Sequence, residues 1–126
     1  MNDYKKEVGL RLRQIREIMN EGSKLSSIQF GYLLDENGDK IRNYEIGRAS
    51  IPIRLLYNLY KRGINPNYII TGLESIFADN EEGKRLAKLT YQRNTKLEIE
   101  IKLKNVESKY TNDDNDLKVA AGRIKK

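Results

Sequence analysis

The sequence contains no cysteine, no histidine and no tryptophan, and its 126 residues include only two prolines. Without cysteine and histidine, the chain has no disulfide bonds, no thiol nucleophile and none of the usual ligands of zinc, haem and copper. It also lacks an apolar run of the roughly 18 residues that span a bilayer, and its first residues lead into an amphipathic stretch rather than a signal peptide. We therefore expect no enzyme, no cofactor, no metal site, no membrane contact and a cytoplasmic location.

Charged residues are abundant at 33%, whereas hydrophobic residues make up only 38% of the chain. This low apolar content predicts that part of the chain is exposed helix or tail rather than core. Lysine and arginine outnumber aspartate and glutamate by 24 to 18, for a net charge of +6. A basic chain suggests a polyanionic partner without identifying it.

Apolar residues recur at helical spacing in five short segments, which are separated by glycine, proline and serine signals. The predicted helices cover about residues 3–20, 26–34, 37–46, 52–62 and 65–71. The predicted core consists of Val8, Leu12, Ile15, Phe30, Leu33, Leu34, Ile41, Tyr44, Leu55, Leu56 and Leu59, with Ile46 as a further candidate. Gly31 lies inside the second segment, where it suggests close approach of another helix. The pattern predicts an all-α domain over residues 1–72.

The chain changes character after Gly72. Residues 73–110 are strongly charged and predict a long C-terminal helix, with a heptad seam at Leu89, Ile99, Leu103, Val106 and Tyr110 that would serve as a dimerisation coiled coil. Residues 97–104 also alternate as a strand does, and a strand paired across a two-fold axis would serve the same end. Residues 111–126 read as a flexible basic tail.

Two short helices joined by a tight turn, preceded by one helix and followed by two, form the layout of a helix-turn-helix DNA reader. Here the sequence resembles the phage-repressor-like (Cro/CI, Xre) helix-turn-helix family over about residues 8–72. The residues that carry this resemblance are Val8-Gly9, Arg11-Leu12, Ile15-Arg16, Leu25-Ser26, Phe30-Gly31, Leu33-Leu34, Ile41, the run Asn43-Tyr44-Glu45-Ile46-Gly47-Arg48, Pro52 and the segment Gly63 to Gly72. The resemblance implies a five-helix lambda-repressor-like domain.

The resemblance further implies that the third helix enters the major groove of DNA. The candidate DNA-binding residues are Ser27, Asn37, Asp39, Lys40, Arg42, Asn43, Arg48 and Ser50. Arg42 and Asn43 are the strongest candidates for base contact, because arginine pairs with guanine and asparagine with adenine through two hydrogen bonds each. Asp39 either accepts from a cytosine amino group or only caps the helix. The competing interpretation is a solvated polar face, as any surface helix has.

The resemblance also implies one structural ion pair, and the chain departs from the family in one turn. Arg16 and Glu45 stand where the family commonly has a structural ion pair between the first and third helices. Asp35 and Glu36 occupy the turn, where the family usually has glycine and then an apolar residue. This departure suggests a rebuilt turn, and acidic residues beside phosphates weaken non-specific affinity.

These features predict a homodimeric, sequence-specific regulator that binds double-stranded DNA, a repressor of phage or mobile-element type. The alternative is a protein-interaction module that keeps the fold without reading DNA, and the acidic turn is its main support.

Overall fold

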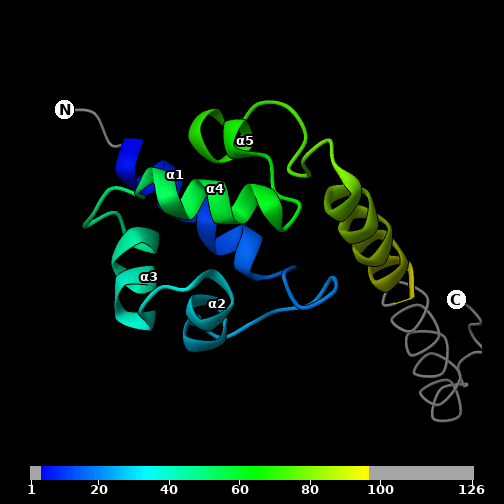
Figure 1. Cartoon of the computed structure of the whole chain (residues 1–126), viewed down its shortest axis with the longest axis horizontal. Coiled ribbons are helices and arrows are strands. Elements are labelled where there is room, and N and C mark those ends of the chain that lie inside the picture. The colour runs from blue at the N-terminus through cyan, green and yellow to red at the C-terminus, as the bar shows by residue number, and fades with distance from the viewer. Residues whose placement is uncertain (1–3, 97–126) are drawn as a thin grey trace, which may run out of the picture. The chain divides into compact units, whose positions relative to one another are not determined.

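The computed structural model describes residues 4–96, which form helices joined by short turns and contain no strand (Figure 1). The helices are α1 (Tyr4–Arg16), α2 (Ser27–Leu34), α3 (Gly38–Glu45), α4 (Ile53–Lys61), α5 (Pro66–Thr71) and a further helix over 81–96. The predicted all-α class is therefore confirmed over these residues. None of the described helices combines the length and the apolar character that crossing a membrane requires.

Helix α1 ends at Arg16, four residues earlier than its apolar spacing predicts. The chain turns there because Glu21 and Gly22 both adopt positive φ, at 50° and 95°, and an isolated bridge joins Asn20 to Ser23. Glycine adopts this backbone region without steric cost, so Gly22 is suited to the reversal. The turn leads the chain back toward the start of α2.

Side-chain caps define where α2 and α3 begin. The Ser26 hydroxyl accepts a hydrogen bond from the Gln29 amide at 3.1 Å, and the Gln29 side chain accepts one from the Ser26 amide at 2.9 Å. This reciprocal capping box satisfies amides that the first helical turn leaves unpaired. Asn37 caps α3, since its Oδ1 accepts from the amides of Asp39 and Lys40 at 2.7 and 3.3 Å.

The turn between α2 and α3 explains the glycine inside α2. A Cβ atom at Gly31 would collide with the carbonyl oxygen of Glu36 in the turn, and it would lie 3.3 Å from the amide nitrogen of Gly38, the first residue of α3. The sequence suggested close approach of another helix, and the nearest group is in the turn that leads into that helix. Asp35 adopts the left-handed conformation, with φ 58° and ψ 48°, and the Glu36 amide donates to the Gly31 carbonyl at 2.7 Å. The turn stays tight because Asp35 adopts the backbone conformation that glycine would favour there.

The buried core joins the helices of the first compact unit (Met1–Tyr91). Fully or almost fully buried apolar residues are Leu12, Ile15, Phe30, Leu34, Ile41, Tyr44, Leu55, Leu59, Ile64, Ile69, Ala78 and Leu86. Val8, Leu33 and Leu56 from the predicted core are half-buried, whereas Ile46 is 54% exposed and lies outside the core. Ile46 follows the last turn of α3, where the chain leaves the helix.

Helix α4 presents hydrogen-bond donors to the end of α2. Arg54, Asn58 and the C-cap residue Arg62 are spaced four residues apart, which places them along one side of α4. Their side chains donate, in that order, to the carbonyl oxygens of Asp35, Leu34 and Leu33 at 3.3, 3.2 and 3.4 Å. These carbonyls lack helical partners at a helix end, so α4 satisfies them from outside the helix.

The first compact unit extends to Tyr91, beyond the boundary predicted at residue 72. Leu86 is 3% exposed and belongs to the core, so the first turns of the helix over 81–96 complete the domain. Asn80 begins this helix by accepting from the Gly83 amide at 2.7 Å, and its Nδ2 donates to the Tyr60 carbonyl at 2.9 Å. The predicted seam from Ile99 onward and the tail over 111–126 lie outside the described residues.

Helices α1 and α3 meet at Gly9, which gives a test of their packing. A Cβ atom at Gly9 would collide with the carbonyl oxygens of Tyr44 and Glu45, which are backbone atoms and cannot rotate away. We expect Gly9→Ala to lower the free energy of unfolding by about 1–3 kcal/mol, measured by urea denaturation. Leu10→Ala is the matched control, since Leu10 is 58% exposed and its loss should change stability little. Equal stability of Gly9→Ala and the wild type would contradict the close approach.

Candidate nucleic-acid interface

Helix α3 has one buried face and one polar face. Ile41, Tyr44 and Glu45 point inward and are buried. Asp39, Lys40 and Arg42 are exposed, and Asn43 is half-buried. Within residues 4–96 the side chains of these last four make no hydrogen bond or ion pair with the protein. We call Asp39, Lys40, Arg42 and Asn43 the outer strip of α3; it carries two cations, one amide and one carboxylate whose polar groups are available to a ligand.

The other predicted contact residues flank this strip, and they differ in exposure and in the hydrogen bonds that they already make. Arg48 and Ser50 are exposed in the loop between α3 and α4 (residues 46–52). Ser27 is the first residue of α2 and is half-buried, and its hydroxyl is not used in the cap because Ser26 fills that role. Asn37 caps α3, and its Oδ1 already accepts from the amides of Asp39 and Lys40, which leaves its side-chain amide nitrogen as the group that could contact a ligand. Asp39 does not cap the helix.

Arg16 and Glu45 form a buried ion pair between α1 and α3. Arg16 Nε lies 2.7 Å from Glu45 Oε2 and its Nη2 lies 3.0 Å from Oε1, while Nη1 donates to the Leu25 carbonyl at 2.9 Å. The two side chains are 10% and 6% exposed. The hydrogen bond to Glu45 raises the pKa of Arg16 above its ordinary value, and this effect exceeds the opposing effect of burial. The two parallel hydrogen bonds fix the orientation of α3 as well as its distance from α1.

Glu36 is buried in the turn, which sequence reasoning did not anticipate. Its side chain is only 6% exposed. Oε1 accepts from the Asn37 amide at 3.0 Å, and Oε2 accepts from the Tyr44 hydroxyl at 2.9 Å and from Arg54 Nη2 at 3.1 Å. The Glu36 side chain is therefore not exposed beside the proposed DNA surface, unlike an acidic residue on the outside of the turn. Of the two turn acids, only Asp35 remains on the surface.

The pKa values of this network follow from its geometry. Burial acts to raise the pKa of Glu36, but the hydrogen bonds from Asn37, Tyr44 and Arg54 outweigh it and lower that pKa below its ordinary value of 4.5. Burial, followed by the hydrogen bond to Glu36, raises the pKa of Tyr44 above 10.0. Glu36 is thus held as a carboxylate and Tyr44 as a neutral donor.

An exposed apolar side chain also flanks the start of α3. Ile28 on α2 is 76% exposed, and its Cγ1 atom lies 3.2 Å from the position of a Cβ at Gly38. Tyr32, one turn later on α2, is 90% exposed. The four-residue spacing of Ile28 and Tyr32 on a short helix, on the face opposite Phe30 and Leu34, is the sequence signal that would have identified both.

The ion pair can be tested by removing one charge. We expect Glu45→Gln to lower the free energy of unfolding by about 3–5 kcal/mol, because the Arg16 charge stays buried without its partner. Glu17→Gln removes an exposed carboxylate one residue from Arg16 and should cost less than about 0.5 kcal/mol. The double variant Arg16→Met/Glu45→Met should recover most of the lost stability, since no lone charge remains. Equal losses in Glu45→Gln and Glu17→Gln, measured by urea denaturation, would contradict this account.

The buried carboxylate predicts an acid-dependent stability. Because the pKa of Glu36 is lower in the folded state, the unfolded state binds more protons in the range between the folded-state pKa and about pH 4.5. The stabilisation is therefore present above pH 4.5 and disappears as the pH falls toward the folded-state pKa. Glu36→Gln should cost about 1–2 kcal/mol at pH 7, a range that allows for the half-exposed Arg54. It should also flatten the decline in stability between pH 5 and pH 3 relative to the wild type, measured by urea denaturation at each pH.

Asp35→Asn provides the matched control for Glu36→Gln. It removes the neighbouring exposed carboxylate, and asparagine tolerates the left-handed backbone of that position. This variant should keep the acid-dependent decline of the wild type. A flattened decline in Asp35→Asn, or an unchanged one in Glu36→Gln, would show that Glu36 is not the group responsible.

Comparisons of the chain with models of protein families, with curated proteins and with solved structures find no match. The resemblance to the phage-repressor-like family therefore rests on the motifs in the chain itself.

Proposed function

We propose that this protein is a sequence-specific regulator that binds double-stranded DNA through α3, a repressor of phage or mobile-element type. The observation that carries the proposal is the outer strip of α3. The side chains of Arg42 and Asn43 make no hydrogen bond or ion pair among residues 4–96, although the helix that bears them is held tightly by the ion pair and the core. Rigid placement of side chains with unused hydrogen-bonding groups is what reading base edges requires.

The surroundings of the strip support contacts to the DNA backbone. Helix α2 begins at Ser27, whose hydroxyl is available beside the positive end of the helix dipole. Arg48 and Ser50 are exposed in the loop after α3. In the proposed complex these three residues bind phosphates and set the register, while Arg42 and Asn43 read bases. The order of the five helices and the α2–turn–α3 unit support a lambda-repressor-like domain.

A homodimer is part of the proposal, because one such domain reads only a few base pairs and two half-sites lie about 34 Å apart. Leu86 and Thr90 are buried against the domain, and Leu89 is half-buried, so the early turns of the helix over 81–96 are already committed to the core. We place the contact between protomers beyond Tyr91.

The second candidate is a protein-interaction module that does not read DNA. The exposed pair Ile28 and Tyr32 on α2 favours it, because large apolar side chains gathered on one helix face are typical of protein contacts. In the DNA proposal, Ile28 instead flanks the start of α3, where an apolar group can contact a thymine methyl.

Selection of binding sites from a random duplex library separates the two candidates. The full chain should enrich one short motif, and its affinity for that duplex should fall as salt rises, because phosphate binding releases counterions. Arg42→Ala/Asn43→Ala should lose at least about thirtyfold in affinity for the selected duplex, given about 1–3 kcal/mol for each base contact. Its weaker affinity for an unrelated duplex should change far less. Fluorescence anisotropy measures both affinities.

Lys88→Ala/Asn67→Ala is the matched control, since it removes one cation and one amide from exposed positions on other helices. This variant should bind the selected duplex about as well as the wild type. Failure to enrich any motif at low salt, or equal losses in the two double variants, would exclude base reading by α3 and favour the interaction module.

A further inference from the structure

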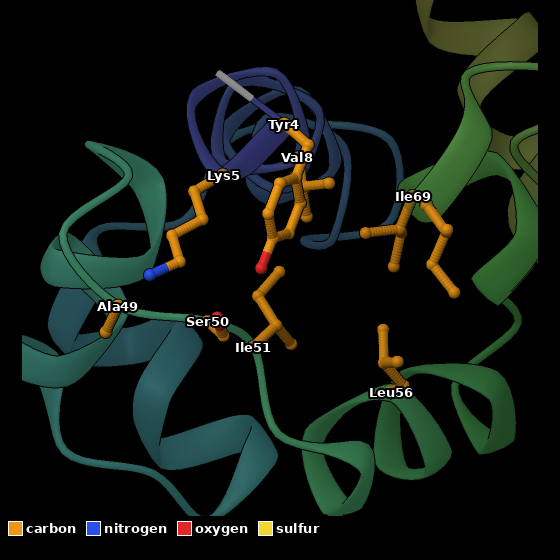
Figure 2. A pocket seen from close by; sticks show the side chains of 9 residues that line it. Tyr4, Lys5, Val8, Ala49, Ser50, Ile51, Leu56 and Ile69 are labelled. Atoms are coloured by element: carbon orange, nitrogen blue, oxygen red, sulfur yellow. The ribbon is translucent and has the colours of Figure 1, made fainter. Parts of the chain in front are cut away.

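A cavity of about 230 Å³ lies between the start of α1, the loop between α3 and α4, α4 and α5 (Figure 2). The side chains of Val8, Ile51, Leu56 and Ile69 converge on it from all four of these segments. Ile69 is fully buried and the other three are half-buried, so the cavity has an apolar floor and opens to solvent. The core leaves this space unfilled, although protein interiors are normally close-packed.

The volume indicates the size of a suitable occupant. An engineered apolar cavity of about 150 Å³ in another protein binds benzene, and typical pockets for drug-sized ligands start at about 300 Å³. The present cavity falls between these limits. It therefore fits an apolar body somewhat larger than benzene, such as a phenyl ring with a short chain or an alkyl chain of about seven carbons.

The charge at the cavity indicates the head group of the occupant. Lys5 is the only charged residue among those that line it, and none of the ion pairs in the part of the chain that the structure describes includes its ammonium group. Figure 2 shows the Lys5 side chain running along the cavity edge toward Ala49. A carboxylate at the edge would pair with Lys5 while its apolar body replaces water over the floor.

We propose that this cavity is an effector site for a small carboxylate with an apolar body. Its lining includes Ala49, Ser50 and Ile51, which belong to the same loop as the proposed phosphate contacts Arg48 and Ser50. A bound carboxylate adds a negative charge beside this loop and opposes the approach of phosphates. This consequence for DNA rests on the proposed function, whereas ligand binding does not.

Methyl NMR of the full chain, titrated with octanoate and with 3-phenylpropanoate, tests the site without DNA. The methyl groups of Val8, Ile51, Leu56 and Ile69 should shift and saturate at millimolar ligand. The methyl groups of Ile28 and Ile53 should not shift in this saturable way, because these side chains are 76% and 83% exposed and do not line the cavity. No saturable shift up to 10 mM (roughly, the weak end of specific ligand binding), or equal shifts at all six residues, would overturn the proposal and indicate non-specific association of the probes.

Matched variants test the head group and the floor. Lys5→Met should raise the Kd of octanoate by about threefold to fivefold, the size typical of one partly exposed ion pair. It should leave the Kd of neutral 1-octanol unchanged. Lys6→Met, which removes the neighbouring cation on α1 outside the cavity, should change neither Kd.

Val8→Phe fills the space and should abolish the saturable shifts, and circular dichroism verifies that this variant is folded. Identical behaviour of Lys5→Met and Lys6→Met would overturn the carboxylate assignment.

The effector role is tested on the selected duplex. Saturating octanoate should weaken DNA binding by about fivefold, as expected for one added charge near the interface, and should not do so in Val8→Phe. Ligand binding with unchanged DNA affinity would overturn the effector role. If the chain binds no DNA, the proposed function fails, and the methyl titration alone decides whether the cavity takes a ligand.

Discussion

The ion pair between Arg16 and Glu45 is the interaction on which the rest of the domain depends. It joins α1 to α3 with two parallel hydrogen bonds, at the point where the missing side chain of Gly9 lets the two helices touch. A buried charge tolerates little displacement, because any movement leaves it without a partner. The buried ion pair therefore fixes the rotation of α3 about its axis, and this rotation determines the direction in which the outer strip points.

The turn before α3 also fixes the orientation of this helix, but it does so through a hydrogen-bonded network around a carboxylate. Glu36 in this turn is buried and ionised, and its carboxylate accepts hydrogen bonds from the Tyr44 hydroxyl and from Arg54. The family that the sequence resembles usually has an apolar residue at this position. Arg54 also caps the end of α2, together with Asn58 and Arg62 from the same face of α4. Polar networks of this kind specify geometry more sharply than apolar contacts, because hydrogen bonds require particular directions. Helix α4 thus holds α2, the turn and α3 as one unit.

The loop that follows α3 carries exposed polar side chains and borders the cavity. Arg48 and Ser50 are exposed on it, and Ser50 and Ile51 also line the cavity at the start of α1. In the proposed complex with DNA, α3 would read bases from a rigid position, whereas the loop would contact phosphates beside the cavity proposed to bind a carboxylate.

The sequence by itself determined the helical class, the ends of most helices and the outward position of Arg42 and Asn43, because caps and apolar spacing act within one or two turns of a helix. The Arg16–Glu45 pair came from the family resemblance, and Arg16 and Glu45 meet in the structure. Only the tertiary structure decided that Glu36 is buried, that Gly31 accommodates the turn and that Leu86 completes the core. These outcomes depend on which distant groups reach a given position, and no local pattern of residues specifies that.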